Sequence, residues 1–137
     1  IDEGLVGSEM CIRDSPGEAA MLLDCSIEEL QKNRLEAAKE LYKKYNCLII
    51  LKGYQTIVFD GEAYQCTDGG PALSTAGTGD VLAGLIGSFL AQGLSKTDAA
   101  KFSVAIHGAA GDRFSKNNRI RGLTATKLIK IINEEML

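Results

Sequence analysis

The apolar run CLIIL at residues 47–51 is the feature that most constrains how this chain can fold. It is followed directly by Lys52. A continuous apolar run of this length is typical of a strand buried on both faces, which needs neighbouring strands and covering helices. The run therefore predicts an α/β domain. Lys52 would emerge at the carboxyl end of a strand, either as part of a ligand site or as a solvated lysine.

Helical and strand patterns flank this run. Pro16 begins a short helix over 16–24, and a capping box from Ser26 to Glu29 begins a longer one that ends near Tyr45. Arg34 interrupts the apolar face of the longer helix, and we expect its charge to reach water. The other predicted elements are strands at 56–59 and 62–66 around an Asp60-Gly61 turn, a Gly-rich loop at 67–79, and helices at 80–92, 96–114 (capped by Ser95) and 124–135 (capped by Thr124).

Residues 1–15 follow no helical or strand period. Their run LVGSEMCIRDS back-translates to the end of a transposon adapter used to prepare sequencing libraries. We interpret residues 1–14 as adapter-derived and Ser15 as the junction codon, and a short disordered arm is the alternative. The four acidic residues in this segment exclude a secretory signal and a transit peptide. We expect residues 1–15 to make few contacts with the rest of the fold.

Charge and cysteine content exclude several classes of protein. The chain has 18 acidic and 15 basic residues, and four of the acids and one of the bases lie in residues 1–15. The remainder is near neutral, with no basic stripe for nucleic acid. Cys25, Cys47 and Cys66 are widely spaced near apolar residues, which indicates reduced thiols of a cytoplasmic protein. The longest apolar runs are too short to cross a membrane.

The sequence GGPALSTAGTGDVLAGLIGSFL, from residue 69, carries the candidate chemistry. Gly77 and Gly79 allow the backbone to approach a ligand closely. The N-terminus of the following helix favours a phosphate or developing negative charge. Asp80 lies at that helix start, either as a cap or as a general base beside a phosphate. The loop lacks the Lys-Ser/Thr ending of the nucleotide-binding P-loop.

Four motifs occur in an order that resembles one enzyme family. They are PGE at 16–18, LKG at 51–53, GTGD at 77–80 and HGAAGD at 107–112. The family is the ADP- or ATP-dependent NAD(P)H-hydrate dehydratases, and the similarity covers residues 16–137. It implies a ribokinase-like three-layer α/β sandwich, of which this chain is expected to be the C-terminal part without the N-terminal strands.

The same resemblance implies an activity. Family members are cofactor-repair lyases that dehydrate hydrated NADH or NADPH and use the terminal phosphate of a nucleotide to make the ring hydroxyl a leaving group. ADP is cleaved to AMP and phosphate, or ATP to ADP and phosphate, and Mg²⁺ arrives with the nucleotide. We expect the fragment alone to be inactive, and the full-length protein to form homo-oligomers that bind neither nucleic acid nor membrane.

The resemblance also assigns roles to individual residues. Asp80 matches the aspartate that contacts the hydrated nicotinamide and acts in proton transfer. Ser15 stands where the family usually has a substrate-binding His, and we interpret it as a His codon overwritten by the adapter. Gly70 departs from the family, which often has Asn near this point. The residues assigned to nucleotide binding are Lys52, Gly53, Tyr54, Gln55, Thr56, Gly77, Thr78 and Gly79.

Two other functions stay open on the sequence alone. A ribokinase-like kinase of a vitamin precursor or other small alcohol would use Asp80 to deprotonate the substrate hydroxyl. A nucleotide-binding module without turnover could use every site group except Asp80. Thr56 and the His that Ser15 replaces favour the dehydratase. We expect His107 to be a packing residue, and we assign no role to Asp112.

Overall fold

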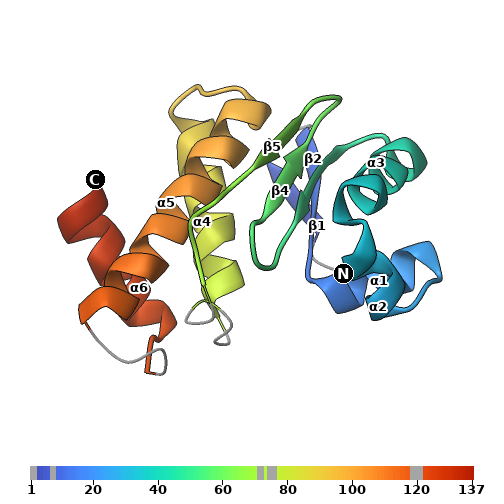
Figure 1. Ribbon diagram of the computed structural model, residues 1–137. Coiled ribbons are helices and arrows are strands. Elements are labelled where there is room, and N and C mark those ends of the chain that lie inside the picture. Colours follow the sequence, from blue (N-terminus) through green and yellow to red (C-terminus); the bar gives the residue numbers. More distant parts are fainter. Residues whose placement is uncertain (1–2, 7–8, 71–72, 74–76, 118–121) are drawn as a thin grey trace. The chain divides into compact units, whose positions relative to one another are not determined.

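The structure is a computed structural model that divides into two compact units, residues 1–65 and 66–137 (Figure 1). It describes residues 3–6, 9–70, 73, 77–117 and 122–137, with side chains described from residue 15 onward. Each unit has its own hydrophobic core. The units are described in turn.

Unit 1 is built on a five-stranded sheet with the order β1-β2-β3-β4-β5. Strands β2 and β3 are parallel, and the other neighbouring pairs are antiparallel. All four side chains of β3 are buried, which confirms the buried strand predicted from the apolar run. Gly61 has a φ of 87° in the turn between β4 and β5, as the predicted hairpin requires. The strands are β1 (Glu3–Val6), β2 (Glu9–Asp14), β3 (Leu48–Leu51), β4 (Ile57–Phe59) and β5 (Ala63–Gln65).

The backbone of residues 9–14 contradicts the expectation of few contacts for the N-terminal segment. Strand β2 runs beside β3, with Cys11 opposite Leu48 and Asp14 opposite Leu51. A buried strand needs a hydrogen-bonding neighbour at each edge, because unpaired backbone groups are costly away from water. Residues 9–14 supply that neighbour for β3. Their adapter origin remains a prediction.

The single helix predicted up to Tyr45 is two helices, α2 (Ile27–Lys32) and α3 (Arg34–Tyr45). Asn33 lies between them with φ −147° and ψ 76°, and its side-chain oxygen accepts from the N–H of Glu36 at 3.3 Å. Asparagine competes with a helix backbone for hydrogen bonds, and it therefore favours a cap over a helix interior. The break makes Arg34 the first residue of α3.

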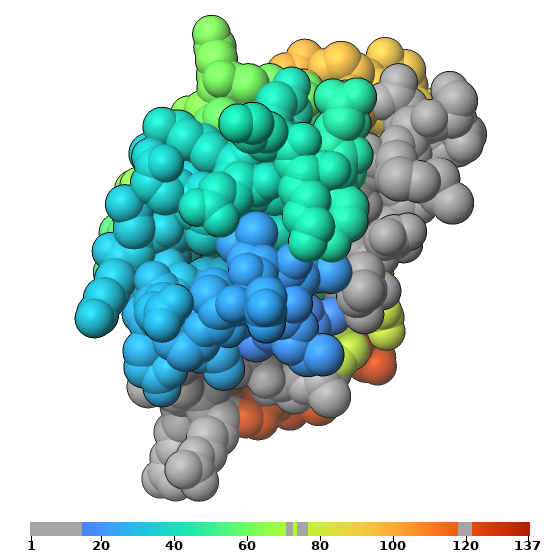
Figure 2. Space-filling view, turned by 90° about the vertical axis from the view of Figure 1, so that its right-hand side faces the viewer, coloured from blue at the N-terminus to red at the C-terminus, as the bar shows by residue number. Residues whose placement is uncertain are grey.

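The core of unit 1 lies between its helices and the sheet. Helices α1 (Pro16–Leu23), α2 and α3 cover one face of the sheet (Figure 1), and they lie within the blue-to-teal part of the surface in Figure 2. Leu41 of α3 is fully buried, and Tyr42 packs edge-on against Phe59 of β4 with ring centroids 5.2 Å apart. Cys47 is a buried thiol, as predicted, whereas Cys25 is only half-buried.

Unit 2 consists of helices preceded by the glycine-rich segment. Helix α4 (Thr78–Ala91) packs along α5 (Lys96–Asn117), and α6 (Ala125–Ile131) continues as a π-helix, η2 (Ile132–Met136). The predicted caps are confirmed: Ser95 Oγ accepts from Asp98 N at 3.1 Å, and Thr124 Oγ1 accepts from Lys127 N at 3.2 Å. In the described part of the chain, no helix has the length and apolarity needed to cross a membrane.

Candidate functional site

The predicted nucleotide segment, residues 52–56, forms a tight turn between β3 and β4. Gly53 has a φ of 141° and Gln55 a φ of 57°, so both lie in the left-handed region. The Thr56 hydroxyl donates to the carbonyl oxygen of Gly53 at 3.1 Å. The Gln65 amide on β5 donates to the side-chain oxygen of Gln55, also at 3.1 Å. The segment is therefore one ordered unit at the carboxyl end of β3.

The guanidinium of Arg34 lies against the backbone of this turn. It donates to the carbonyl oxygens of Leu51 at 3.1 Å, of Lys52 and Gln55 at 3.3 Å each, and of Tyr54. Arg34 is half-buried, so its charge is partly exposed, and the sequence pattern did not predict these backbone contacts. Burial lowers the pKa of the Arg34 guanidinium from its ordinary value. The sequence signal for these contacts was that Arg34 is the single charged residue within an apolar helix face. We interpreted it only as an interruption of that face.

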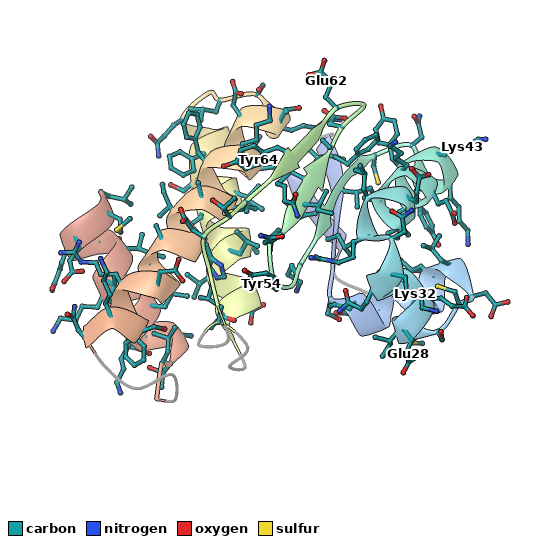
Figure 3. All side chains as sticks on the ribbon, in the orientation of Figure 1. Glu28, Lys32, Lys43, Tyr54, Glu62 and Tyr64 are labelled. Atoms are coloured by element: carbon teal, nitrogen blue, oxygen red, sulfur yellow. The ribbon has the colours of Figure 1, made fainter. Side chains whose placement is uncertain are left out.

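A cleft of about 480 Å³ lies beside the turn, between the α2–α3 junction and β5. Tyr54 and Gln55 line it on one side and Lys32 on the other. The Tyr54 ring is 71% exposed, and its place in unit 1 is marked in Figure 3. A volume of this size falls within the range of small-molecule clefts, which is about 300–1,000 Å³.

Ser15 caps helix α1 next to the same turn. Its hydroxyl accepts from the N–H of Glu18 at 3.4 Å, and its own N–H donates to the Glu18 carboxylate at 3.4 Å, which completes a capping box. The hydroxyl also donates to that carboxylate at 2.8 Å. A Cβ placed on Gly53 would lie 3.6 Å from the Pro16 ring. The structure therefore brings the PGE and LKG motifs together. The interpretation of Ser15 as the remnant of a His remains a prediction.

In unit 2, the glycine loop leads directly into α4. Gly77 is the N-cap with a φ of 90°, and a Cβ there would lie 3.2 Å from Ala125 Cβ, so a side chain would be strained and crowded. The helix begins two residues before the predicted position. Asp80 is in the first turn and is exposed, with its N–H donating to the Gly77 carbonyl oxygen at 3.2 Å. Because Gly77 is the N-cap, the interpretation of Asp80 as the N-cap is wrong.

Thr78 anchors the start of α4 to unit 2. It is only 5% exposed, and its hydroxyl donates to the carbonyl oxygen of Leu73 at 2.6 Å. The carbonyl oxygen of Thr78 lies 2.8 Å from His107 Nε2 on α5, so this ring nitrogen is the donor. The expectation that His107 is a packing residue is therefore incomplete, because it also holds the first residue of the helix that carries Asp80.

The rest of the HGAAGD motif holds the segment before the loop. Asp112 Oδ2 accepts from the N–H of Gly69 at 2.9 Å. A Cβ on Gly108 would lie 2.7 Å from the carbonyl oxygen of Asp68, and one on Gly111 would lie 2.6 Å from Leu73. The segment therefore lies directly on α5. The spacing of positions 107, 108, 111 and 112, which share one helix face, was the signal for this role.

The described residues offer no ready-made metal cage. Among them, no group of three or more His, Cys, Asp and Glu side chains could hold a metal ion. The thiol of Cys66 is buried and close to the carbonyl oxygens of Asp68 and Val104, and burial raises its pKa.

The predicted site residues thus form two groups, one in each unit. Unit 1 holds Ser15 beside the turn at 52–56, and unit 2 holds Gly77, Gly79 and Asp80 at the start of α4. The first group offers an ammonium and a backbone turn, which suit phosphate oxygens. The second offers the positive end of a helix dipole and a carboxylate, which suit a developing anion and a proton transfer.

Comparison with known proteins gives consistent sequence matches. A family model described as NAD(P)H-hydrate dehydratase matches residues 12–134, so the match begins within the segment that we interpret as adapter-derived. The bifunctional NAD(P)H-hydrate repair enzyme of Vibrio cholerae is 39% identical over 93% of this chain and 26% of its own length. The ADP-dependent (S)-NAD(P)H-hydrate dehydratase of Neisseria meningitidis is 41% identical over 71% of this chain and 33% of its own. The chain thus spans about a quarter to a third of these relatives.

Solved structures match the fold. The ADP/ATP-dependent NAD(P)H-hydrate dehydratase from Bacillus subtilis, co-crystallised with ATP/Mg²⁺, has a TM-score of 0.85 and 32% identity, covering 90% of this chain and 45% of that one. A ribokinase-like superfamily protein from Enterococcus faecalis has a TM-score of 0.79 and 29% identity, covering 92% of this chain and 43% of that one. The expected ribokinase-like α/β fold is confirmed.

Proposed function

The chain belongs to the NAD(P)H-hydrate dehydratase family, and we propose that it is part of an enzyme that converts hydrated NADH or NADPH back to NAD(P)H with cleavage of ADP or ATP. The observation that carries this proposal is the exposed carboxylate of Asp80 in the first turn of α4, directly after Gly77 and Gly79. A helix N-terminus favours a phosphoryl group at this place, and the carboxylate beside it can take a proton.

The proposed reaction has two steps. The hydroxyl oxygen of the hydrated ring attacks the terminal phosphorus of the nucleotide, Asp80 takes the hydroxyl proton, and the nucleotide leaves one phosphate shorter. Phosphate then departs with the electrons of the carbon–oxygen bond, and loss of a proton from the neighbouring ring carbon restores the double bond. The N-terminus of α4 stabilises the phosphoryl charge, and Lys52 binds phosphate oxygens.

The remaining parts of the proposal concern the setting of the reaction. The proposal that Mg²⁺ would be held by the nucleotide phosphates rests on the family resemblance and on phosphate chemistry. Cys25, Cys47 and Cys66 are thiols outside any disulfide, which supports a cytoplasmic location. Assembly as a homo-oligomer rests on the resemblance alone. Because the chain spans 45% of the Bacillus subtilis dehydratase, we expect the 137 residues alone to show no turnover.

The decisive variant is Asp80→Asn, tested in the protein encoded by the complete gene. Asparagine keeps the size of the side chain but cannot take the proton, so phosphate release that depends on hydrated NADH should fall by about 10²–10⁴-fold. The loss of a negative charge near the helix dipole should lower the free energy of unfolding by only about 0.3–1 kcal/mol. ADP affinity should stay near its wild-type value.

Asp98→Asn is a matched control. Asp98 occupies the corresponding first-turn position of α5, three residues after the capping Ser95, and it is exposed. This variant should lose the same dipole interaction and keep full turnover. Retained turnover in Asp80→Asn would remove Asp80 from the mechanism. Consumption of ATP with a small alcohol, and none with hydrated NADH, would indicate a kinase. ADP binding without any turnover would indicate a binding module.

A further inference from the structure

Arg34 is half-buried in unit 1, and its contacts are not predicted by its sequence position. The break at Asn33 makes it the first residue of α3, and its guanidinium points to the turn at residues 52–56. Its Nε is buried and finds no partner among the described residues. The side chain is therefore half-buried, with its guanidinium bonded to this turn.

The hydrogen bonds of Arg34 account for most of the turn's carbonyl groups. One terminal nitrogen donates to the carbonyl oxygens of Tyr54 and Gln55, and the other donates to those of Leu51 and Lys52. The Thr56 hydroxyl donates to the carbonyl oxygen of Gly53, which is the remaining carbonyl of this segment. All five consecutive carbonyl oxygens from 51 to 55 thus accept from a side chain, and four of them accept from one guanidinium.

This arrangement also orients the N–H groups of the turn. A trans peptide unit is planar, and its N–H points opposite to its C=O; no described peptide bond is cis. The N–H groups of Gly53, Gln55 and Thr56 therefore point away from Arg34. Successive N–H groups that share a side of a turn form a concavity suited to an anion. Gly53 is needed for this packing, because a Cβ there would lie 3.1 Å from an Arg34 terminal nitrogen.

We propose that Arg34 is a positioning residue: it holds the backbone of residues 52–56 so that the N–H groups and Lys52 face a nucleotide phosphate, without touching the nucleotide itself. The inference rests on the proposed nucleotide role of this turn. A planar fork with five donors can serve four carbonyls at once, whereas a lysine ammonium is a single point charge with three donors. Charge alone at this position would not maintain the turn.

The test measures the turn directly, apart from any activity. Amide order parameters from NMR relaxation for residues 52–56 should fall from about 0.85 in the wild-type chain to below about 0.6 in both Arg34→Gln and Arg34→Lys. In the same samples, the dissociation constant for ADP should rise about tenfold or more, because several charge-assisted hydrogen bonds are lost. The dissociation constant for hydrated NADH should stay within about twofold, since the rest of the site is unchanged.

Arg113→Gln is the matched control, because Arg113 forms an exposed ion pair with Glu135 in unit 2. It should leave the order parameters of 52–56 and the ADP affinity unchanged. If both Arg34 variants keep a rigid turn, the proposal is refuted. If the turn loosens and ADP affinity does not change, Arg34 is only a structural residue and the proposal is equally refuted. A third outcome separates this proposal from the proposed function: the turn is rigid in the wild type and loosens in both variants, but the chain does not bind ADP. This result would refute the nucleotide role of the turn, and Arg34 would remain the residue that holds the turn.

Discussion

Replacing Gly108 by alanine tests the contact between helix α5 and the segment that leads to the glycine loop. A Cβ at this position would lie 2.7 Å from the carbonyl oxygen of Asp68 and 2.9 Å from its carbonyl carbon. Both atoms are backbone, so no side-chain rotation can relieve the clash. Either α5 or the segment at 66–70 must move.

The size of the effect follows from one stabilising term and two destabilising terms. Alanine in place of glycine within a helix ordinarily stabilises a protein by about 1 kcal/mol. Overpacking a close contact costs about 1–3 kcal/mol. Movement of the segment would also strain the hydrogen bond from Gly69 N to Asp112, and a bond to a charged group is worth about 1.5–3 kcal/mol. We expect Gly108→Ala to lower the free energy of unfolding by about 1–3 kcal/mol.

Gly84→Ala is the control, because Gly84 lies within α4 of the same unit and, among the described residues, no atom outside its own stretch of helix lies within 4 Å of its Cβ position. This variant should raise the free energy of unfolding by up to about 1 kcal/mol. Urea denaturation followed by circular dichroism measures both variants, with equal m-values as the check that the same surface unfolds. If Gly108→Ala is as stable as Gly84→Ala, the segment does not lie on α5, and our account of the HGAAGD motif fails.

The other predictions concern single side chains. In the complete protein, Lys52→Ala should weaken ADP binding about tenfold and hydrated NADH binding little, because the ammonium binds phosphate oxygens; equal losses measured by calorimetry would argue for a structural role. Ser15→His should lower the free energy of unfolding by about 1 kcal/mol, because it removes the capping box, and should tighten binding of hydrated NADH; unchanged binding would contradict the remnant interpretation. Burial raises the pKa of the Cys66 thiol above its ordinary value of 9.0, so the unfolded chain loses this proton at a lower pH than the folded chain. The free energy of unfolding should therefore fall as the pH rises above 9, and Cys66→Ala should reduce that fall. An unchanged pH profile in Cys66→Ala would contradict this prediction.

Several features of the fold could be predicted from the sequence because they depend on neighbours in the chain. The apolar run before Lys52 predicts a strand that is buried on both faces, and all four side chains of β3 are buried. The caps at Ser95 and Thr124 and the turn at Gly61 are local hydrogen-bond and backbone preferences, and each is present. The motif order likewise predicted the family, because a motif is a property of the chain itself.

Other features required the tertiary structure. The sequence pattern extended one helix across Asn33, which was wrong, and it did not predict the contacts of Arg34 with the turn at residues 52–56. Asp80 was equally compatible with a cap and a base until Gly77 proved to be the N-cap. The N-terminal residues follow no clear period, and yet residues 9–14 form a strand because β3 offers them an edge.

The common physical reason is distance along the chain. Arg34 meets Gln55 across 21 residues, His107 meets the Thr78 carbonyl across 29, and Asp112 meets the Gly69 N–H across 43. A helical period shows which face of α5 is apolar, but it does not show which backbone group lies opposite that face. The sequence by itself therefore determined the buried strand, the caps and the family, whereas only the tertiary structure decided which half-buried polar side chains hold the candidate site residues within each unit.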